Sequence, residues 1–149
     1  GFGYTDSNFR IKKDHGHRNG GWGTSLMTMD RSGNVTFAGN VTAYSDERLK
    51  TEIKTIENPL DTISKLRGVT FKWKESGDDS MGVIAQEVEA IAETKCLVSE
   101  TPEDGNGDIN PKNVAYGNMV GLLIEGMKEQ QTVINRLVQD IKDLKDKIK

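Results

Sequence analysis

A serine and a lysine lie five positions apart in the segment Ser45-Asp46-Glu47-Arg48-Leu49-Lys50. A serine hydroxyl is a weak nucleophile at neutral pH and needs an adjacent base. A lysine amine can be that base only where burial or nearby cations lower its pKa from roughly 10.4 toward neutrality. The pair stands at a seam between a segment rich in glycine, threonine and asparagine and a segment with helical periodicity. This placement suggests a domain that cuts itself free.

The spacing of the two residues raises a geometric question. Residues five apart on a straight helix differ by about 140° in direction, so Ser45 and Lys50 would not meet on one. Ser45 must lie just outside the helix with its chain bent back, or Lys50 must come from another protomer. The alternative is a plain helix start, with Ser45 as N-cap, Asp46 and Glu47 at the positive end of the dipole and a solvated Lys50. Free helix N–H groups near Asp46 and Glu47 are candidate donors to an oxyanion.

Three other features could carry chemistry, and for each we favour the plainer interpretation. His15 and His17 would point the same way from an extended chain, and a three-fold axis would bring six nitrogens together for a transition metal. An exposed polar loop is favoured there, so no metal is expected. The acidic segment 101–108 lacks the ligand spacing and terminal glutamate of a calcium loop, which favours a solvated loop. A single cysteine, Cys96, excludes an internal disulfide and a cysteine zinc cluster, and we expect it to be buried in packing.

Composition limits the classes of partner. The chain has 149 residues, of which 34% are hydrophobic and 29% charged, so we expect its core to be completed by association. Residues 1–44 carry five Lys/Arg against three Asp/Glu, and the remainder carries fifteen against twenty. Because neither part is a polycation, nucleic acid is not an expected partner. No apolar stretch is long enough to span a membrane, and no signal-peptide pattern opens the chain.

The elements upstream of Ser45 are expected to be short strands. Residues 26–30 and 35–37 alternate on either side of the turn 31–34, and residues 41–44 alternate again after Gly39-Asn40. Strands this short could hardly bury a core within one chain. They are better explained by a fibrous β-structure wound around symmetry mates, with a linker or an edge hairpin as the alternative.

The elements downstream of Ser45 alternate between helix and strand. A helix is expected from Ser45 with an apolar stripe of Leu49, Ile53 and Ile56, and a second one from Pro59 to a cap at Gly68. The remaining expectations are a strand over 69–74 with Trp73 in the core, a partner strand over 81–84, and a helix over 85–92 with Val88 and Ile91 inward.

A heptad pattern closes the chain. Steps of four and three from Tyr116 select a stripe that is apolar at every position but one: Val120, Leu123, Met127, Gln130, Ile134, Leu137, Ile141, Leu144 and Ile148. Gln130 and the flanking Ile124, Val133 and Val138 favour three strands. A helix packed on its own domain is the alternative up to about residue 127. Beyond it the stripe is narrow and needs other copies of itself.

Three ordered segments and these heptads resemble a known family. Residues 45–53, 66–73 and 82–89 read SDERLKTEI, LRGVTFKW and GVIAQEVE. They resemble the C-terminal intramolecular chaperone domain of phage tail spikes, tail fibres and neck appendages, also called the endosialidase-type or S74 peptidase domain. The resemblance covers residues 45–149, and residues 26–44 look like the end of the fibre before such a domain.

The resemblance implies specific roles at matching positions. Members form trimers, assist folding of the β-structure upstream, and then release themselves by cutting before the motif serine. The scissile bond would be Tyr44–Ser45, with Ser45 as nucleophile and Lys50 as the dyad lysine. Attack on the Tyr44 carbonyl could be direct or pass through an N-to-O acyl shift. Gln86 and Glu87 are candidate accessory residues near the cleavage site, or ordinary first-turn helix residues.

The sequence therefore predicts an α+β chain. Residues 1–44 would end a trimeric β-fibre, and residues 45–149 would form a self-cleaving chaperone domain with a coiled coil over 116–149. The expected activity is that of a single-turnover serine endopeptidase in a homotrimer, whose client and substrate is the upstream fibre segment. No cofactor, nucleic acid or membrane is expected. The site of action would be a phage tail fibre, spike or neck appendage, with the chaperone part released in the host cytoplasm. The alternative function is a permanent, uncleaved trimerisation module at the end of a receptor-binding fibre.

Overall fold

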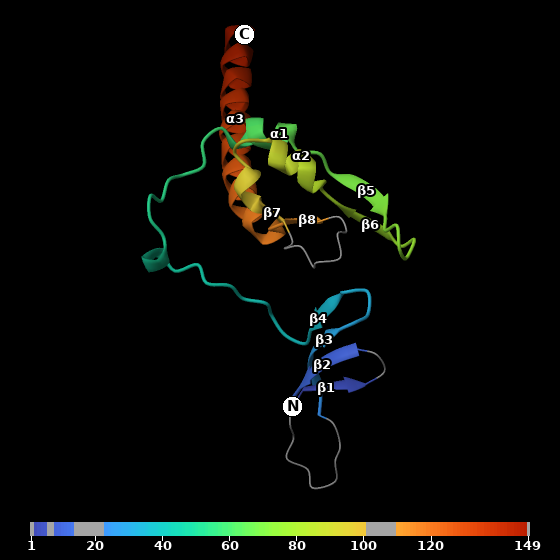
Figure 1. Ribbon diagram of the computed structural model, residues 1–149. Helices are drawn as coiled ribbons and strands as arrows, with labels where there is room; N and C mark the ends of the chain where they lie inside the picture. The colour runs from blue at the N-terminus through green and yellow to red at the C-terminus, as the bar shows by residue number, and fades with distance from the viewer. Residues whose placement is uncertain (1, 6–7, 14–22, 101–109, 149) are drawn as a thin grey trace. The chain divides into compact units, whose positions relative to one another are not determined.

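The computed structural model describes residues 8–13, 23–100 and 110–148, together with the backbone of residues 2–5 (Figure 1). The chain divides into two compact units, Gly1–Glu52 and Ile53–Lys149. Small antiparallel sheets, short helices and one long C-terminal helix make up the two units, so the predicted α+β class is confirmed. The predicted domain boundary after Tyr44 stays a prediction. His15, His17 and the acidic segment 101–108 lie outside the described residues.

The first unit holds a single antiparallel sheet in the order β1-β2-β3-β4. Its strands are β1 Phe2–Thr5, β2 Asn8–Lys12, β3 Ser25–Met29 and β4 Val35–Phe37. The Asp30 carboxylate accepts hydrogen bonds from the backbone and side chain of Asn34, which tightens the turn between β3 and β4. Gly33 adopts φ +81° in this turn, a conformation that costs glycine nothing. The expected strands at 26–30 and 35–37 are confirmed, and β1 and β2 were not predicted.

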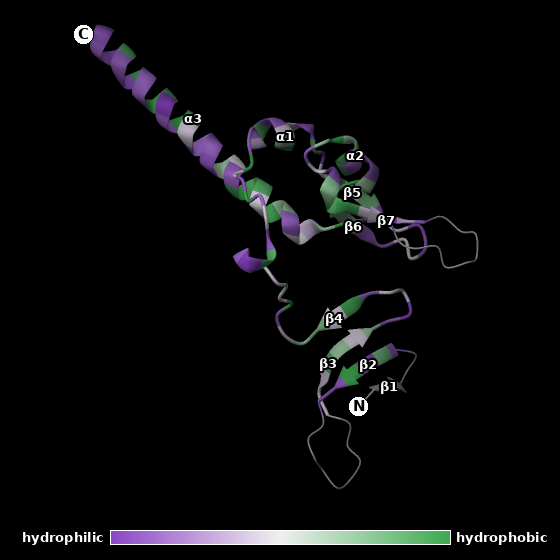
Figure 2. Ribbon diagram, turned by 60° about the vertical axis from the view of Figure 1, so that its left-hand side comes forward, coloured by the Kyte–Doolittle hydropathy of each residue, from purple (hydrophilic) through white to green (hydrophobic). Residues whose placement is uncertain are grey.

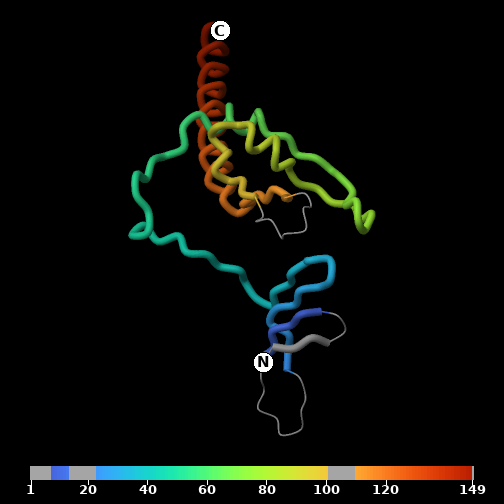
Figure 3. Tube along the Cα trace, viewed as in Figure 1, coloured from blue at the N-terminus to red at the C-terminus, as the bar shows by residue number. Residues whose placement is uncertain are grey.

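This sheet is one layer thick. None of the residues whose burial is described in this unit is buried, and Leu26, Met29, Val35 and Phe37 are all exposed. The strand expected at residues 41–44 does not form. Figure 3 shows this stretch as part of the extended trace that follows β4. The single chain offers no described neighbouring strand for its backbone groups, and a lone strand is unstable in water.

The second unit contains α1 Pro59–Lys65, α2 Ala85–Ala90 and α3 Met119–Ile148. Its two small sheets pair β5 Val69–Lys72 with β6 Asp79–Gly82, and β7 Val98–Glu100 with β8 Lys112–Val114. Short 3-10 turns lie at Lys95–Leu97 and Tyr116–Asn118. The predicted hairpin is confirmed, although β5 ends at Lys72 and β6 begins at Asp79. The β7–β8 pair was not predicted.

One part of the core lies between α1 and α3. Leu122 and Gly126 of α3 are buried, and the Ile63 side chain of α1 occupies the space beside Gly126. Asn58 precedes α1 at φ +49° and makes no side-chain cap, but Glu129 Oε2 accepts a hydrogen bond of 3.1 Å from Leu60 N. α1 ends at Lys65 because Leu66 is extended. The expected cap at Gly68 is therefore wrong.

A second part of the core lies beneath α2. Val88 is 1% exposed and Thr94 is 2% exposed, and Thr94 Oγ1 donates a hydrogen bond of 2.8 Å to Val88 O. The inward placement of Val88 is confirmed. Ile91 is half-buried and extended, so α2 ends at Ala90 rather than at residue 92.

Three other sequence expectations are wrong. The helix expected from Ser45 is reduced to the single 3-10 turn η1, Glu47–Leu49, because Leu49 and Ile53 have nothing to pack against and short isolated helices are marginal. Trp73 is 59% exposed and touches Phe71 edge-on, with ring centroids 5.2 Å apart. Cys96 is exposed. Trp73 follows a two-stranded sheet and Cys96 lies in a 3-10 turn, and both elements are too small to enclose a large side chain.

α3 runs for 30 residues and changes character along its length. Its first three turns pack on α1, as expected under the alternative in which the helix packs on its own domain up to about residue 127. Every described residue from Gln130 onward is exposed. Figure 2 shows hydrophobic residues recurring along an otherwise hydrophilic helix. The long helix is confirmed, whereas the three-stranded coiled coil stays a prediction. Among the described residues, no helix has the length and apolarity needed to cross a membrane.

Candidate active site

The structure brings the two predicted catalytic residues into contact. Lys50 Nζ donates hydrogen bonds of 2.9 Å to Ser45 Oγ and 3.2 Å to Ser45 O. Both residues belong to the same chain and to the first unit. Of the two geometries expected from the sequence, the structure therefore has the one in which the chain bends back. A nucleophile and a base within hydrogen-bond reach of each other are the starting arrangement for nucleophilic catalysis.

The bend comes from η1. Asp46, with φ −64° and ψ 133°, is the N-cap of this turn, and its Oδ1 accepts a hydrogen bond of 2.9 Å from Arg48 N. Asp46 O accepts from Leu49 N, and Glu47 O accepts from Lys50 N. The interpretation of Ser45 as N-cap is therefore wrong. Asp46 takes that role because its carboxylate reaches the N–H two residues on, which leaves the Ser45 hydroxyl to Lys50.

The Asp46 carboxylate also binds the Arg48 side chain, a contact that the sequence analysis missed. Arg48 Nε lies 3.0 and 3.1 Å from the two carboxylate oxygens, and Nη2 lies 2.5 Å from Oδ2. The hydrogen bond from the Arg48 side chain lowers the pKa of Asp46 and, in return, raises the pKa of Arg48. The feature of the sequence that could have indicated this contact is an arginine two positions after an aspartate that can cap a helix.

The bond expected to be cut is accessible. Tyr44 is 96% exposed, and every residue from 41 to 50 is exposed in the single chain. The backbone N–H groups of Asp46 and Glu47, the candidate oxyanion donors, have no acceptor among the described residues. The Glu47 side chain likewise has no described partner. The Tyr44–Ser45 bond and the residues that follow it are thus open to solvent in the single chain.

The candidate accessory residues Gln86 and Glu87 belong to the second unit and lie in the first turn of α2. Arg67 Nε donates to Glu87 Oε2 at 3.2 Å, and Arg67 Nη2 forms an ion pair with Oε1. The hydrogen bond from Arg67 lowers the pKa of Glu87 and raises that of Arg67. This pair ties together two of the segments on which the resemblance rests. A role of Gln86 or Glu87 at the cleavage site stays a prediction.

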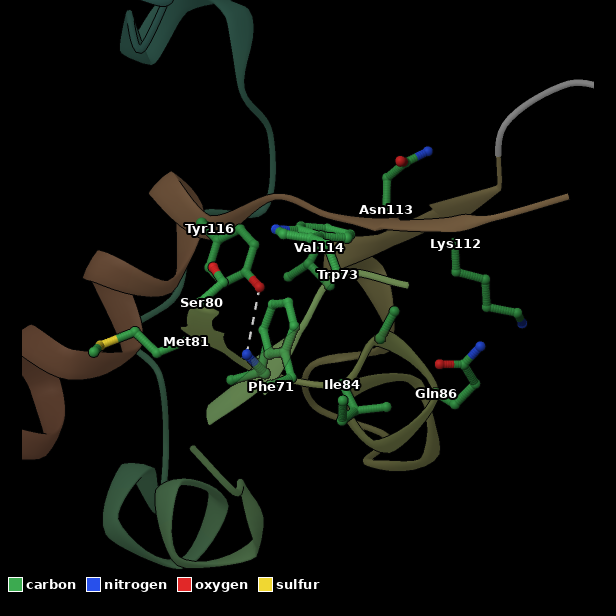
Figure 4. A pocket seen from close by; sticks show the side chains of 12 residues that line it. Phe71, Trp73, Ser80, Met81, Ile84, Gln86, Lys112, Asn113, Val114 and Tyr116 are labelled. Atoms are coloured by element: carbon green, nitrogen blue, oxygen red, sulfur yellow. Dashed lines mark hydrogen bonds between the residues drawn. The ribbon is translucent and has the colours of Figure 1, made fainter. Parts of the chain in front are cut away.

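A groove of about 570 Å³ lies within the second unit, beside β6 and β8 (Figure 4). Aromatic side chains of Phe71, Trp73 and Tyr116 line it, with Met81 and Gln86 at its edges. Tyr116 Oη accepts a hydrogen bond of 3.3 Å from Val83 N, drawn as the dashed line in Figure 4. Sequence analysis did not predict this groove. The described residues contain no group of three or more side chains that could hold a metal ion.

The heptad stripe lies on the uncovered side of α3. Its apolar members are each between 45% and 84% exposed in the single chain: Val120, Leu123, Met127, Ile134, Leu137, Ile141, Leu144 and Ile148. Gln130 lies in the same stripe and is exposed as well. An apolar stripe of this kind along a helix is typical of a coiled-coil interface.

Comparison with known proteins agrees with the resemblance noted in the sequence. The chain is 30% identical over 151 aligned residues to the long tail fiber protein Gp37 of Salmonella phage S16, a match that covers 87% of this chain and 20% of that protein. It is 33% identical over 105 residues to the proteins of the same name from Enterobacteria phages K3 and T2, covering 67% of this chain and 8% of each relative. The chain thus spans a fifth or less of the length of these relatives. Residues 45–97 match the family described as chaperone of endosialidase.

Proposed function

We propose that this chain ends a phage tail fibre or spike and acts as its intramolecular chaperone. It brings three copies together, aids folding of the β-structure upstream, and then releases itself by cutting Tyr44–Ser45. The single observation that carries the cleavage step is the contact of 2.9 Å between Lys50 Nζ and Ser45 Oγ. The matches to the chaperone-of-endosialidase family and to tail fibre proteins support the assembly role.

In the cleavage step, Ser45 Oγ attacks the carbonyl carbon of Tyr44 and its proton passes to the neutral Lys50 amine. The C–N bond between Tyr44 and Ser45 then breaks as Ser45 N takes a proton, leaving the Tyr44 acyl group as an ester on Oγ. Water hydrolyses the ester to a Tyr44 carboxylate and a chain that begins at Ser45. Backbone N–H groups of Asp46 and Glu47 stabilise the oxyanion. The two products are the same whether or not the ester accumulates before water hydrolyses it.

Assembly supplies what the single chain lacks. An amine that is open to water holds its proton at neutral pH, and a neighbouring chain that covers it favours the neutral form by desolvation. Lys50 is exposed in the single chain. The trimer would form through the exposed stripe of α3, with Gln130 as its one polar layer. The partners are thus two further copies and the chain's own residues 1–44, and the product belongs to the virion, with the chaperone part left in the host cytoplasm.

The test is the mass of the full-length product. We expect wild type to yield a fragment that begins at Ser45, identified by intact mass and N-terminal sequencing. Ser45→Ala and Lys50→Ala should each abolish that fragment and leave an uncut trimer by sedimentation, because neither side chain belongs to a core. Lys54→Ala, which removes another exposed amine, is the matched control and should be cut normally. A fragment beginning at residue 45 in Ser45→Ala would contradict the assignment.

A second candidate function is a permanent trimerisation module at the end of a receptor-binding fibre. The full exposure of the segment around Ser45 in the single chain favours it, since nothing described there removes the amine from water. In that case the contact between Ser45 and Lys50 only stabilises a surface turn. A stable full-length wild-type chain in the same experiment would select this function.

A further inference from the structure

The turn that carries Lys50 has few interactions to hold it. η1 spans only Glu47–Leu49, and two backbone hydrogen bonds close it, from Leu49 N to Asp46 O and from Lys50 N to Glu47 O. No residue from 38 to 52 is buried, so packing does not support the turn in the single chain. Short 3-10 turns without packing are marginal in water. Something else must keep Lys50 folded back onto Ser45.

The pair of Asp46 and Arg48, here called the Asp46–Arg48 clasp, is placed to do this. The Asp46 carboxylate accepts from three nitrogens of Arg48: N at 2.9 Å, Nε at 3.0 Å and Nη2 at 2.5 Å. A charge-assisted, two-pronged contact of this kind fixes geometry better than a single neutral hydrogen bond does. The contact joins two of the four residues that separate Ser45 from Lys50, and therefore restricts the backbone between them.

We propose that Asp46 is a positioning residue for self-cleavage: with Arg48, it holds the turn in which Lys50 Nζ lies against Ser45 Oγ. The inference rests on the proposed cleavage at Tyr44–Ser45 and goes beyond the dyad itself.

Cleavage rates of the full-length chain test the proposal. Asp46→Ala removes the cap and the ion pair, and we expect cleavage to slow by about twofold to thirtyfold, the range of a lost N-cap. Asp46→Asn keeps an oxygen for Arg48 N and should be slowed less. Arg48→Ala should also be slow, and the double variant should be no slower than Asp46→Ala alone, because both residues act through one contact. Glu57→Ala, which removes an exposed carboxylate outside the turn, is the matched control and should be cut at the wild-type rate.

A second measurement reports on positioning without relying on cleavage. In a Cys96→Ser background, Ser45→Cys places a thiol next to Lys50, and the pH dependence of its alkylation in the uncut chain gives its pKa. A nearby ammonium lowers a thiol pKa. The thiol pKa of the Ser45→Cys/Lys50→Ala variant therefore shows how much of that lowering comes from Lys50. We expect Asp46→Ala to raise the thiol pKa toward the value measured with Lys50→Ala, and Glu57→Ala to leave it unchanged. Loss of the Asp46 charge by itself would lower the thiol pKa, so a rise identifies lost positioning.

The two measurements distinguish a failure of the proposed function from a failure of the positioning role of Asp46. A wild-type chain that stays uncut contradicts the proposed function, while the thiol pKa still decides whether the clasp positions Lys50. If wild type is cut normally and Asp46→Ala changes neither the cleavage rate nor the thiol pKa, the positioning role of the clasp is wrong and the proposed function is unaffected. If Glu57→Ala slowed cleavage as much as Asp46→Ala does, the clasp would also be overturned. An unchanged sedimentation coefficient and melting temperature for Asp46→Ala would show that assembly and global folding are intact.

Discussion

At the scale of single residues, Gly82 is present because Tyr116 needs its space. A Cβ added at Gly82 would lie 2.7 Å from Tyr116 Oη, which accepts the hydrogen bond from Val83 N. We therefore expect Gly82→Ala to lower the free energy of unfolding by about 1–3 kcal/mol, as overpacking does. Chemical denaturation of the full chain measures this.

Two variants make this prediction specific. Gly68→Ala is the matched control, because nothing lies within 4 Å of a Cβ at that position, and it should cost little. Tyr116→Phe removes the hydroxyl that would clash, so adding it to Gly82→Ala should recover part of the lost stability. Additive effects of the two substitutions would contradict a shared contact.

Expectations for single residues were met where the chemistry of two side chains favours their pairing. They were wrong where two neighbouring residues could fill the same structural role. The contact between Ser45 and Lys50 within one chain was one of the two geometries expected, because a hydroxyl that acts as a nucleophile would need a base. The identity of the N-cap residue was not predictable. Ser45 and Asp46 are both good N-cap residues, and only the position of Arg48 favours Asp46. Exposure of Trp73 and Cys96 was mispredicted because burial depends on how much surrounding structure one chain provides.

At the scale of elements, α1 is held by the contact of Ile63 with Gly126 of α3. Alanine is preferred to glycine in a helix interior by up to about 1 kcal/mol, so two glycines in α3 need a reason. A Cβ at Gly126 would collide with Ile63 Cδ1, whereas a Cβ at Gly121 would lie 3.8 Å from Ile56 Cδ1, an ordinary contact. Gly126 therefore permits the close approach of α1, and Gly121 does not limit it.

The two positions give a matched pair of substitutions. We expect Gly121→Ala to raise the free energy of unfolding by about 0.5–1 kcal/mol. Gly126→Ala should lose that gain or destabilise the chain, because Ile63 must move from a packed position. Ile63→Val in the Gly126→Ala background should restore part of the stability by shortening the colliding side chain. Equal stabilisation by both alanines in thermal unfolding would contradict the packing of α1 on Gly126.

The elements themselves were predictable in proportion to their periodicity. The heptads of α3 and the alternation of β4 and β5 are regular, and these elements form close to where they were expected. Residues 41–44 and the stretch around Leu49 and Ile53 have equally apolar patterns, but no other described part of the chain covers them, so neither becomes a strand or an α-helix. β7 and β8 are three residues each and are joined by a long connection, which left no periodic signal to detect.

At the scale of the whole molecule, the exposed apolar residues are of the kind that association with further copies would cover. The stripe of α3 and the apolar residues around Ser45 are covered by nothing described in one copy. A coiled coil can align three chains before the short strands upstream pair with one another. This alignment removes much of the association entropy from the slow step, which is the registration of distant β-strands.

Under the proposed function, assembly should also control cutting, because Ser45 and Lys50 are exposed in the single chain and would be covered by neighbouring chains. Ile134→Asp with Ile141→Asp would bury charges in the α3 seam at a cost of several kcal/mol per trimer layer. We expect this variant to sediment as a monomer and to be cut far more slowly than wild type, because it lacks the partner chains that we propose cover the dyad. Ser45, Lys50 and their turn remain intact in it. Lys142→Asp, an exposed charge change outside the seam, should assemble and be cut normally.

Release would then make assembly irreversible. Once the chaperone part has left, the fibre trimer has lost the element that aligned its strands, so it persists through a high unfolding barrier rather than through an equilibrium. We therefore expect cleaved fibre trimers to resist dissociation in denaturant and to fail to re-form after complete unfolding, whereas uncut Ser45→Ala trimers should refold. Sedimentation after a cycle of unfolding and dilution measures both. Rapid cutting in the monomeric Ile134→Asp/Ile141→Asp variant would show that the dyad needs no partner chain, and equal refolding of cut and uncut trimers would show that release does not trap the fibre.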